Sequence, residues 1–222
     1  MSRDTDTQPA PARSLGHVAL HYGRVEEAPL AAKLLKKLGF TETQDLPLPQ
    51  GGRFYRFVVD QKHYARGDGI IYLSPAPPAQ RALIEAVRSA LKVGSRDEHP
   101  AVRGLRDAIA ADPEYTFHVG ILLESLEALE QTILDLQADE DLKDRIKVCL
   151  NRPRPGNPEV DARLDASPVY GRVERYAYGA NGVQAFIETD LLSSGVLGES
   201  LVIELDYVFP NYANHVLSVV EM

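Results

Sequence analysis

Hydrophobic and polar positions change their spacing several times along the chain, and these changes mark the expected regular elements. Residues 17–22, HVALHY, are rich in residue types that favour strands. Residues 25–40, VEEAPLAAKLLKKLGF, instead place apolar side chains at helical spacing and end beside Gly39, a residue type that suits the end of a helix. The first two elements are therefore expected to be a strand and then a helix.

Three more strands are expected in the first third of the chain. Residues 40–46, 53–60 and 69–75 are strand candidates. The segments between them, residues 47–52 and 65–69, contain the proline and glycine that are typical of turns. The expected order is strand, helix, strand, strand, strand.

The same order returns in the second half. Residues 115–124, YTFHVGILLE, favour a strand, and residues 125–137 begin with a serine and carry leucines at the spacing of a capped amphipathic helix. Residues 153–168 show no such pattern and are expected to form a long loop, which in a small domain often serves a site. The remaining strands are expected at residues 144–153, 172–178, 182–192 and 200–209.

The repeated order predicts an α+β protein of two βαβββ modules that form a cupped mixed β-sheet. Residues 78–93 and 101–112 have helical patterns and are expected to be linker helices between the modules. The repeat depends on element order and on the pair GHVAL and FHVGI, so the alternative is an unrelated α+β domain with two histidine-bearing strands. The predicted units are a disordered tail at 1–13, the first module at 14–77, a helical linker at 78–113 and the second module at 114–222.

Composition narrows the class of protein without identifying it. The 222 residues include 44% apolar and 25% charged residues, which is ordinary for a soluble globular protein. The net charge of −8 and the absence of a basic run argue against nucleic acid or an anionic membrane as a partner. The single cysteine, Cys149, is expected to be an inert core thiol and excludes an intrachain disulfide. With no secretory signal or membrane span in the sequence, a cytoplasmic location is expected.

Histidines stand at equivalent places in the first strands of the two halves. Because side chains alternate along a strand, His17, Ala19 and His21 share one face. His118 shares a face with Gly120 in the same way. Both histidine faces carry small residues, as the lining of a cavity does.

A carboxylate lies in the last predicted strand, LVIELDYVF. Glu204 has apolar neighbours on both sides, and burial of an unpartnered carboxylate costs several kcal/mol, so a neutralising partner is expected. With His17 and His118 it would complete a 2-His-1-carboxylate set, which leaves coordination positions open on Fe(II); zinc, manganese and nickel are further options. The structural alternative is that both histidines are hydrogen-bonded core residues and that Glu204 pairs with an arginine.

The pattern resembles the vicinal oxygen chelate superfamily, which includes glyoxalase I, methylmalonyl-CoA epimerase, bleomycin-resistance proteins and extradiol dioxygenases. The family builds a cupped sheet from paired βαβββ modules and takes metal ligands from their first and last strands, here HVAL, IIYL, HVGI and VIEL. The resemblance implies His17, His118 and Glu204 as ligands. Tyr72 falls where glyoxalases and epimerases usually have a fourth ligand and extradiol enzymes have none. The resemblance therefore favours an Fe(II) dioxygenase for a small substrate with vicinal oxygens.

One departure from the extradiol pattern concerns the acid–base group. Those enzymes usually carry a histidine in the second module, and none stands between His118 and Glu204. His21 is the substitute candidate for a general base, because an imidazole titrates near neutral pH; alternatively it only hydrogen-bonds within the cup. Tyr178 and Tyr176 are candidate donors to a developing oxyanion, or else packed strand aromatics. Tyr72 and Tyr176 are also expected to line the substrate pocket.

Two other classes of function stay open. One is a redox-neutral isomerase, epimerase or lyase, and the other is a non-catalytic small-molecule binding protein of the bleomycin-resistance type. A homodimer is expected whichever function applies, because the exposed edges of such modules often pair. Arg53, Arg56 and Arg172 are candidates for recognising an anionic substrate, although arginines at strand ends are usually solvated.

Overall fold

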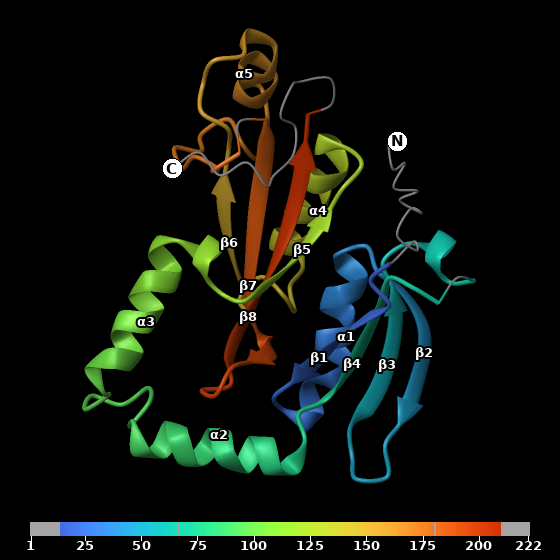
Figure 1. Ribbon diagram of the computed structural model, residues 1–222, viewed down its shortest axis with the longest axis vertical. Helices are drawn as coiled ribbons and strands as arrows, with labels where there is room; N and C mark the ends of the chain where they lie inside the picture. The colour runs from blue at the N-terminus through green and yellow to red at the C-terminus, as the bar shows by residue number, and fades with distance from the viewer. Residues whose placement is uncertain (1–13, 66, 180, 210–222) are drawn as a thin grey trace, which may run out of the picture.

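A computed structural model describes residues 14–65, 67–179 and 181–209 (Figure 1). The tail predicted at residues 1–13 lies outside the described residues. Two four-stranded mixed sheets and five helices are present in the described part, which confirms the predicted α+β class with two similar modules. Each module has its own sheet, and the two sheets do not close into one barrel.

The first module has strand order β1-β4-β3-β2. Its first and last strands, β1 at the edge and β4 beside it in the sheet, run parallel, while the other pairs are antiparallel. This parallel pairing of first and last strands requires the helix between β1 and β2 to cross over the sheet. The elements are β1 (His17–Tyr22), η1 (Val25–Glu27), α1 (Ala28–Lys37), β2 (Thr41–Pro47), β3 (Arg53–Val58), η2 (Gln61–His63) and β4 (Ile70–Pro75).

The second module repeats that plan with strand order β5-β8-β7-β6. Again the first and last strands, β5 and β8, are parallel neighbours. Two linker helices, α2 (Pro78–Ala90) and α3 (Pro100–Ala111), run along the outside of the molecule between the modules (Figure 1). The second module consists of η3 (Pro113–Tyr115), β5 (His118–Leu122), α4 (Leu126–Ala138), β6 (Ile146–Asn151), α5 (Pro158–Asp165), β7 (Gly182–Ser194) and β8 (Glu199–Val208).

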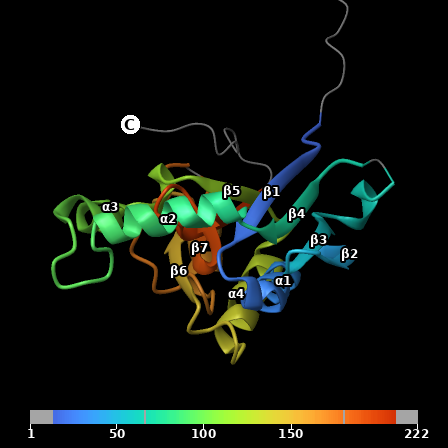
Figure 2. The ribbon, with the colours of Figure 1, turned by 90° about the horizontal axis from the view of Figure 1, so that it is seen from below.

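Each sheet packs one face against a helix and leaves the other face for the site. In β1, Leu20 and Tyr22 are buried in the core, whereas His17 on the opposite face is exposed. Helices α1 and α4 lie side by side on the packed faces of the two sheets (Figure 2). Gly39 ends α1 with a φ of +92°, and the Ser125 hydroxyl accepts from the N–H of Ala128 at the start of α4, as expected of helix caps.

Ion pairs connect the modules around this helix layer. Lys33 Nζ on α1 lies 2.6 Å from Asp139 Oδ1, just beyond α4. Arg145 reaches Glu27 Oε1 and Asp190 Oδ1, both at 2.9 Å.

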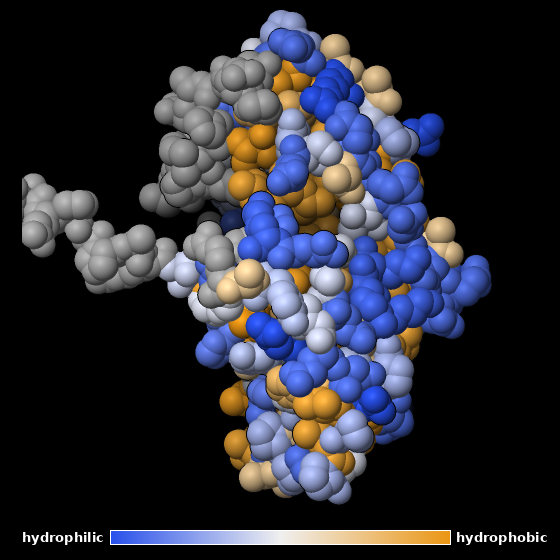
Figure 3. All heavy atoms as spheres, turned by 90° about the vertical axis from the view of Figure 1, so that its right-hand side faces the viewer, coloured by the Kyte–Doolittle hydropathy of each residue, from blue (hydrophilic) through white to orange (hydrophobic). Residues whose placement is uncertain are grey.

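Figure 3 shows the side of the molecule that lies on the right in Figure 1. This surface is mostly hydrophilic, with scattered hydrophobic groups. Among the described residues, no helix combines the length and apolar character that crossing a membrane requires.

Two predictions about the second module were wrong. Residues 172–178 are not a strand, because the pairing is confined to an isolated bridge between Arg152 and Tyr176. Pro153 and Pro155 flank this point on one side and have no N–H to extend a ladder. Residues 153–168 are not a plain loop, since they contain the short helix α5. Its start is fixed by Asn157, whose Oδ1 accepts from the N–H groups of Glu159 and Val160.

Candidate metal centre

The strand pairing of the second module brings His118 and Glu204 together. In the register of β5 and β8, His118 lies opposite Val202 and Gly120 lies opposite Glu204. The two polar side chains therefore project from the same face, and His118 Nε2 lies 2.9 Å from Glu204 Oε2. Glu204 is only 5% exposed. The partner expected for this buried carboxylate is thus a histidine, not an arginine.

The other nitrogen of the His118 ring is also fixed. Nδ1 lies 2.8 Å from the carbonyl oxygen of Thr116, which only accepts hydrogen bonds, so Nδ1 carries the ring hydrogen. In a neutral imidazole this leaves a lone pair on Nε2, directed at the Glu204 carboxylate. Two lone pairs at 2.9 Å repel each other, and a proton or a metal ion is needed between them. A backbone carbonyl on the non-ligating nitrogen is the usual outer partner of a metal-binding histidine.

Glu114, which no sequence pattern selects, completes a group of three with His118 and Glu204. Ligand atoms of Glu114, His118 and Glu204 all lie within 4.8 Å of one another. Glu114 belongs to η3, just ahead of β5, where the Asp112 carboxylate caps the turn by accepting from the N–H of Glu114. The sequence shows an acidic residue four positions before His118, but its approach depends on how this turn is placed.

Gln184 of β7 links the two carboxylates of this group. Its Nε2 donates to Glu114 Oε2 at 2.9 Å and to Glu204 Oε1 at 2.6 Å. Gln184 is itself 5% exposed and is opposite Asp206 in the β7–β8 register. No sequence pattern selects Gln184, because one glutamine in an apolar strand has no characteristic spacing.

Negative charge is in excess around the group. Burial, followed by the neighbouring Glu204 carboxylate, raises the pKa of Glu114 above its ordinary value. The same two causes raise the pKa of Asp206 to about 8. Asp206 Oδ1 is also buried and has no hydrogen-bond partner within the described part of the chain. Three carboxyl groups and one imidazole therefore share a small region that a cation would stabilise.

This donor set fits a divalent metal ion. Carboxylate oxygens and an imidazole nitrogen are ligands of zinc, manganese and iron. Access is open at Gly120, an exposed residue: a Cβ built there would lie 3.6 Å from Glu204 Oε2 and 3.7 Å from Asp206 Oδ2. The absence of a side chain at position 120 therefore leaves space directly over two of the carboxylate oxygens.

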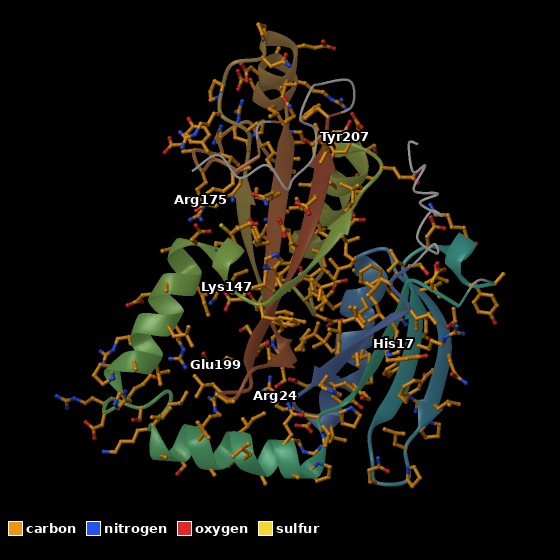
Figure 4. All side chains as sticks on the ribbon, in the orientation of Figure 1. His17, Arg24, Lys147, Arg175, Glu199 and Tyr207 are labelled. Atoms are coloured by element: carbon orange, nitrogen blue, oxygen red, sulfur yellow. The ribbon has the colours of Figure 1, made fainter. Side chains whose placement is uncertain are left out.

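The predicted ligand His17 lies in the other sheet (Figure 4). Its ring centroid is 5.1 Å from that of Tyr72, and Tyr72 in turn lies 5.5 Å from Phe54. Among the described residues, the group able to hold a metal contains Glu114 instead of His17. The structure thus brings together two of the three predicted ligands, and a metal-binding role for His17 stays a prediction.

The predicted catalytic side chains have defined neighbours. His21 Nδ1 lies 3.3 Å from Ser74 Oγ, within the first sheet. Tyr178 Oη donates to Asp112 Oδ2 at 2.5 Å and so helps to fix the segment that carries Glu114. Tyr176 is 42% exposed, with the guanidinium of Arg154 5.1 Å from its ring centroid. These contacts position the side chains, and their catalytic roles stay predictions.

Other side chains selected from the sequence have simpler surroundings. Arg53 is paired with Asp45, and the guanidinium of Arg56 lies 5.6 Å from the ring centroid of Tyr64. Burial raises the pKa of the Cys149 thiol, which lowers its reactivity at neutral pH. The three carboxyl groups gathered around His118, those of Glu114, Glu204 and Asp206, all belong to the second module.

Comparisons with known proteins give distant structural matches. TnmS3, an antibiotic binding protein from Streptomyces sp. CB03234, is similar over 90% of this chain and 98% of that chain, with 12% identity and a TM-score of 0.38. A possible glyoxalase from Bacillus cereus is similar over 87% of this chain and 98% of that chain, with 14% identity and a TM-score of 0.36. No protein-family model and no curated protein sequence matches the chain.

Proposed function

We propose that this protein is a divalent-metal-dependent enzyme that acts on a small substrate with vicinal oxygens. Glu114, His118 and Glu204 are the proposed ligands. The proposal is supported chiefly by the 2.9 Å approach of His118 Nε2 to Glu204 Oε2, with Nδ1 held by the Thr116 carbonyl. An ion at this place removes the repulsion between the two lone pairs and offsets the excess of carboxylates.

The residues around the site perform separate tasks in this proposal. The bound metal supplies Lewis-acid activation of a substrate oxygen. The Thr116 carbonyl holds the His118 imidazole in the tautomer that leaves Nε2 available. The bare backbone at Gly120 lets a substrate approach the Glu204 carboxylate, which a larger side chain would cover.

The donor set favours a redox-neutral reaction. Two carboxylates and one imidazole form a harder set than the two imidazoles and one carboxylate of the iron-dioxygenase pattern. A reaction that moves a proton next to a polarised oxygen, as an isomerase, epimerase or lyase does, needs no change in the oxidation state of the metal. His21 is our candidate for the group that moves this proton.

An Fe(II) dioxygenase is the second candidate. His118 and Glu204 are two members of a 2-His-1-carboxylate set, and Tyr72 occupies the position at which that class needs no ligand. This reaction requires His17 to act as the third ligand in place of Glu114. The two candidates therefore differ in which of these two residues is needed for metal binding.

The test measures bound metal by inductively coupled plasma mass spectrometry after purification without chelators. The variants are His118→Ala, Glu204→Gln, Glu114→Gln and His17→Ala, each checked for folding by circular dichroism. Loss of metal from the first three variants, with His17→Ala unchanged, is expected for the redox-neutral proposal. Loss from His17→Ala with Glu114→Gln unchanged would favour the dioxygenase, to be followed by an oxygen-uptake assay with catechols.

A further outcome separates both enzymes from a binding protein. If the wild-type protein holds no metal and takes up none from Mn²⁺, Zn²⁺ or Fe²⁺ solutions, the enzymatic proposal fails. The chain would then be a small-molecule binding protein of the bleomycin-resistance type, the remaining class consistent with its sequence pattern.

A further inference from the structure

We propose that Gln184 is the positioning residue of the metal centre, and that Arg175 and Asn151 fix the orientation of its amide group. This inference rests on the proposed metal-binding function and adds residues to it. Gln184 is buried, and its single amide nitrogen donates one hydrogen to each of two proposed ligands, Glu114 and Glu204. Its orientation therefore decides where both carboxylates lie.

The amide of Gln184 is the inner end of a chain of hydrogen bonds. Asn151 Nδ2 on β6 donates to Gln184 Oε1 at 3.2 Å. Arg175 Nε in turn donates to Asn151 Oδ1 at 3.1 Å, and Arg175 Nη2 donates to the carbonyl of Ala111 at 2.8 Å. Because Ala111 precedes η3, the same guanidinium also helps to place the turn that carries Glu114. Figure 4 labels Arg175 beside the second sheet.

The donor and acceptor groups at the two ends of this series of hydrogen bonds allow only one direction of donation. A guanidinium has no acceptor, so Asn151 must turn its oxygen toward Arg175 and its NH₂ toward Gln184. Gln184 must then accept at Oε1 and present its own NH₂ to the glutamates, which accept when ionised. Neither amide can flip without placing two acceptors or two donors against each other. A distant arginine thus determines that hydrogen-bond donors face the ligands.

The Gln184 amide holds two negatively charged carboxylates close together, and this arrangement favours metal binding. Glu114 and Glu204 repel each other. Burial, and after it the charge of Glu204, raises the pKa of Glu114. The neutral NH₂ group of Gln184 bonds to one oxygen of each carboxylate. The second oxygen of each remains for a metal ion. Outer partners of this kind contribute about 10- to 100-fold to metal affinity in known sites.

An isosteric substitution tests the direction of hydrogen-bond donation from Arg175 through Asn151 to Gln184. In Asn151→Asp the new carboxylate still accepts from Arg175 but offers no hydrogen to Gln184, so Gln184 is expected to turn its oxygen toward the glutamates. Co²⁺ affinity is then expected to fall about 10-fold or more. A simple charge effect predicts the opposite sign, because an added carboxylate attracts a cation. The matched control is Asn157→Asp, where aspartate caps α5 as well as asparagine does.

Gln184→Met provides a second variant that removes the donor at similar volume. Both variants are titrated with Co²⁺, and the visible absorption of the bound ion reports whether its ligand set has changed. Weaker binding with an altered spectrum, in a protein whose circular dichroism matches the wild type, is the expected result. Unchanged or tighter binding by both folded variants would overturn the inference. Absence of Co²⁺ binding by the wild-type protein would instead overturn the metal-binding proposal itself.

Discussion

His118 Nε2 and Glu204 Oε2 lie 2.9 Å apart although neither residue is near the other in the sequence. Their contact follows from the parallel pairing of β5 with β8. A metal ion bound at this place would contact the folded state alone, so its free energy of binding would add to the free energy of unfolding. The centre is therefore accessible to stability measurements as well as to metal analysis.

Metal addition is expected to raise the thermal unfolding midpoint of the wild-type protein. At about 100 times its dissociation constant, a ligand adds about 2.7 kcal/mol to the free energy of unfolding. Glu204→Gln is expected to abolish this stabilisation. Glu188→Gln is the control, since Glu188 lies on a neighbouring strand and pairs with Lys147. Differential scanning fluorimetry with Co²⁺ or Zn²⁺ provides the measurement, and equal stabilisation of both variants would contradict the assignment of Glu204.

Asp206 is expected to make the metal-free protein less stable as the pH rises. Its pKa is about 8 in the folded protein, against an ordinary value of 3.8 in the unfolded chain. Between these values the folded state binds more protons than the unfolded state, so the free energy of unfolding falls with rising pH. The penalty is absent below the unfolded value and complete above the folded one.

The variant Asp206→Asn isolates the contribution of this carboxyl group. Its thermal midpoint is expected to depend less on pH between about pH 4 and pH 8 than that of the wild type. Asp107→Asn, at an exposed position on α3, should leave the wild-type dependence intact. Parallel pH profiles for the Asp206 variant and the wild type would show that this carboxyl is ordinary.

Arg145 is expected to be a main stabilising contact between the modules. Its guanidinium bonds across the modules to Glu27 and within its own module to Asp190, and its side chain is 22% exposed. Arg145→Met removes both charged hydrogen bonds and should lower the free energy of unfolding by about 1.5–3 kcal/mol. Lys143→Met, which breaks an exposed pair with Glu140, should cost less than about 0.5 kcal/mol. Urea denaturation distinguishes them, and equal costs would count against the role of Arg145.

Gly52 is expected to tolerate a methyl group less well than its neighbour Gly51. Both have positive φ angles, +81° and +90°, so alanine is strained at either position. At position 52, however, the added Cβ would lie 2.7 Å from Tyr22 Oη, whereas at position 51 the nearest atom is 3.9 Å away. The Tyr22 hydroxyl bonds to the backbone of Arg53. Gly52→Ala should cost about 1–3 kcal/mol more than Gly51→Ala in thermal unfolding.

Much of the fold could be predicted because the repeated signals are local. Alternation in HVALHY and the helical spacing that ends at Gly39 depend on neighbouring residues, and the structure follows both. The errors lie where local signals are short or ambiguous. The local signal for helix α5 is short and is limited to the cap at Asn157. Residues 172–178 alternate like a strand, but their strand pairing is limited to one isolated bridge, between Tyr176 and Arg152.

The candidate site was predictable only in part, for a related reason. His118 and Glu204 are polar residues in apolar strands, so their burial and need for partners could be inferred from the sequence. Glu114 and Gln184 join them through the placement of a turn and through the register of β7 on β8, which local patterns do not encode. The repeat also suggested equal roles for His17 and His118, yet their surroundings differ.

The parallel pairing of β5 and β8 has a consequence for the order in which the protein becomes functional. β5 begins at His118, but the strand that completes the centre, β8, is made only when synthesis reaches residues 199–208. A growing chain can therefore form the whole first module before the second sheet is complete, because β8 lies between β5 and β7 in that sheet. Since loop closure over such a distance is slow compared with local helix formation, the centre is expected to assemble late. Metal uptake by nascent or refolding chains would consequently report completion of the last strand.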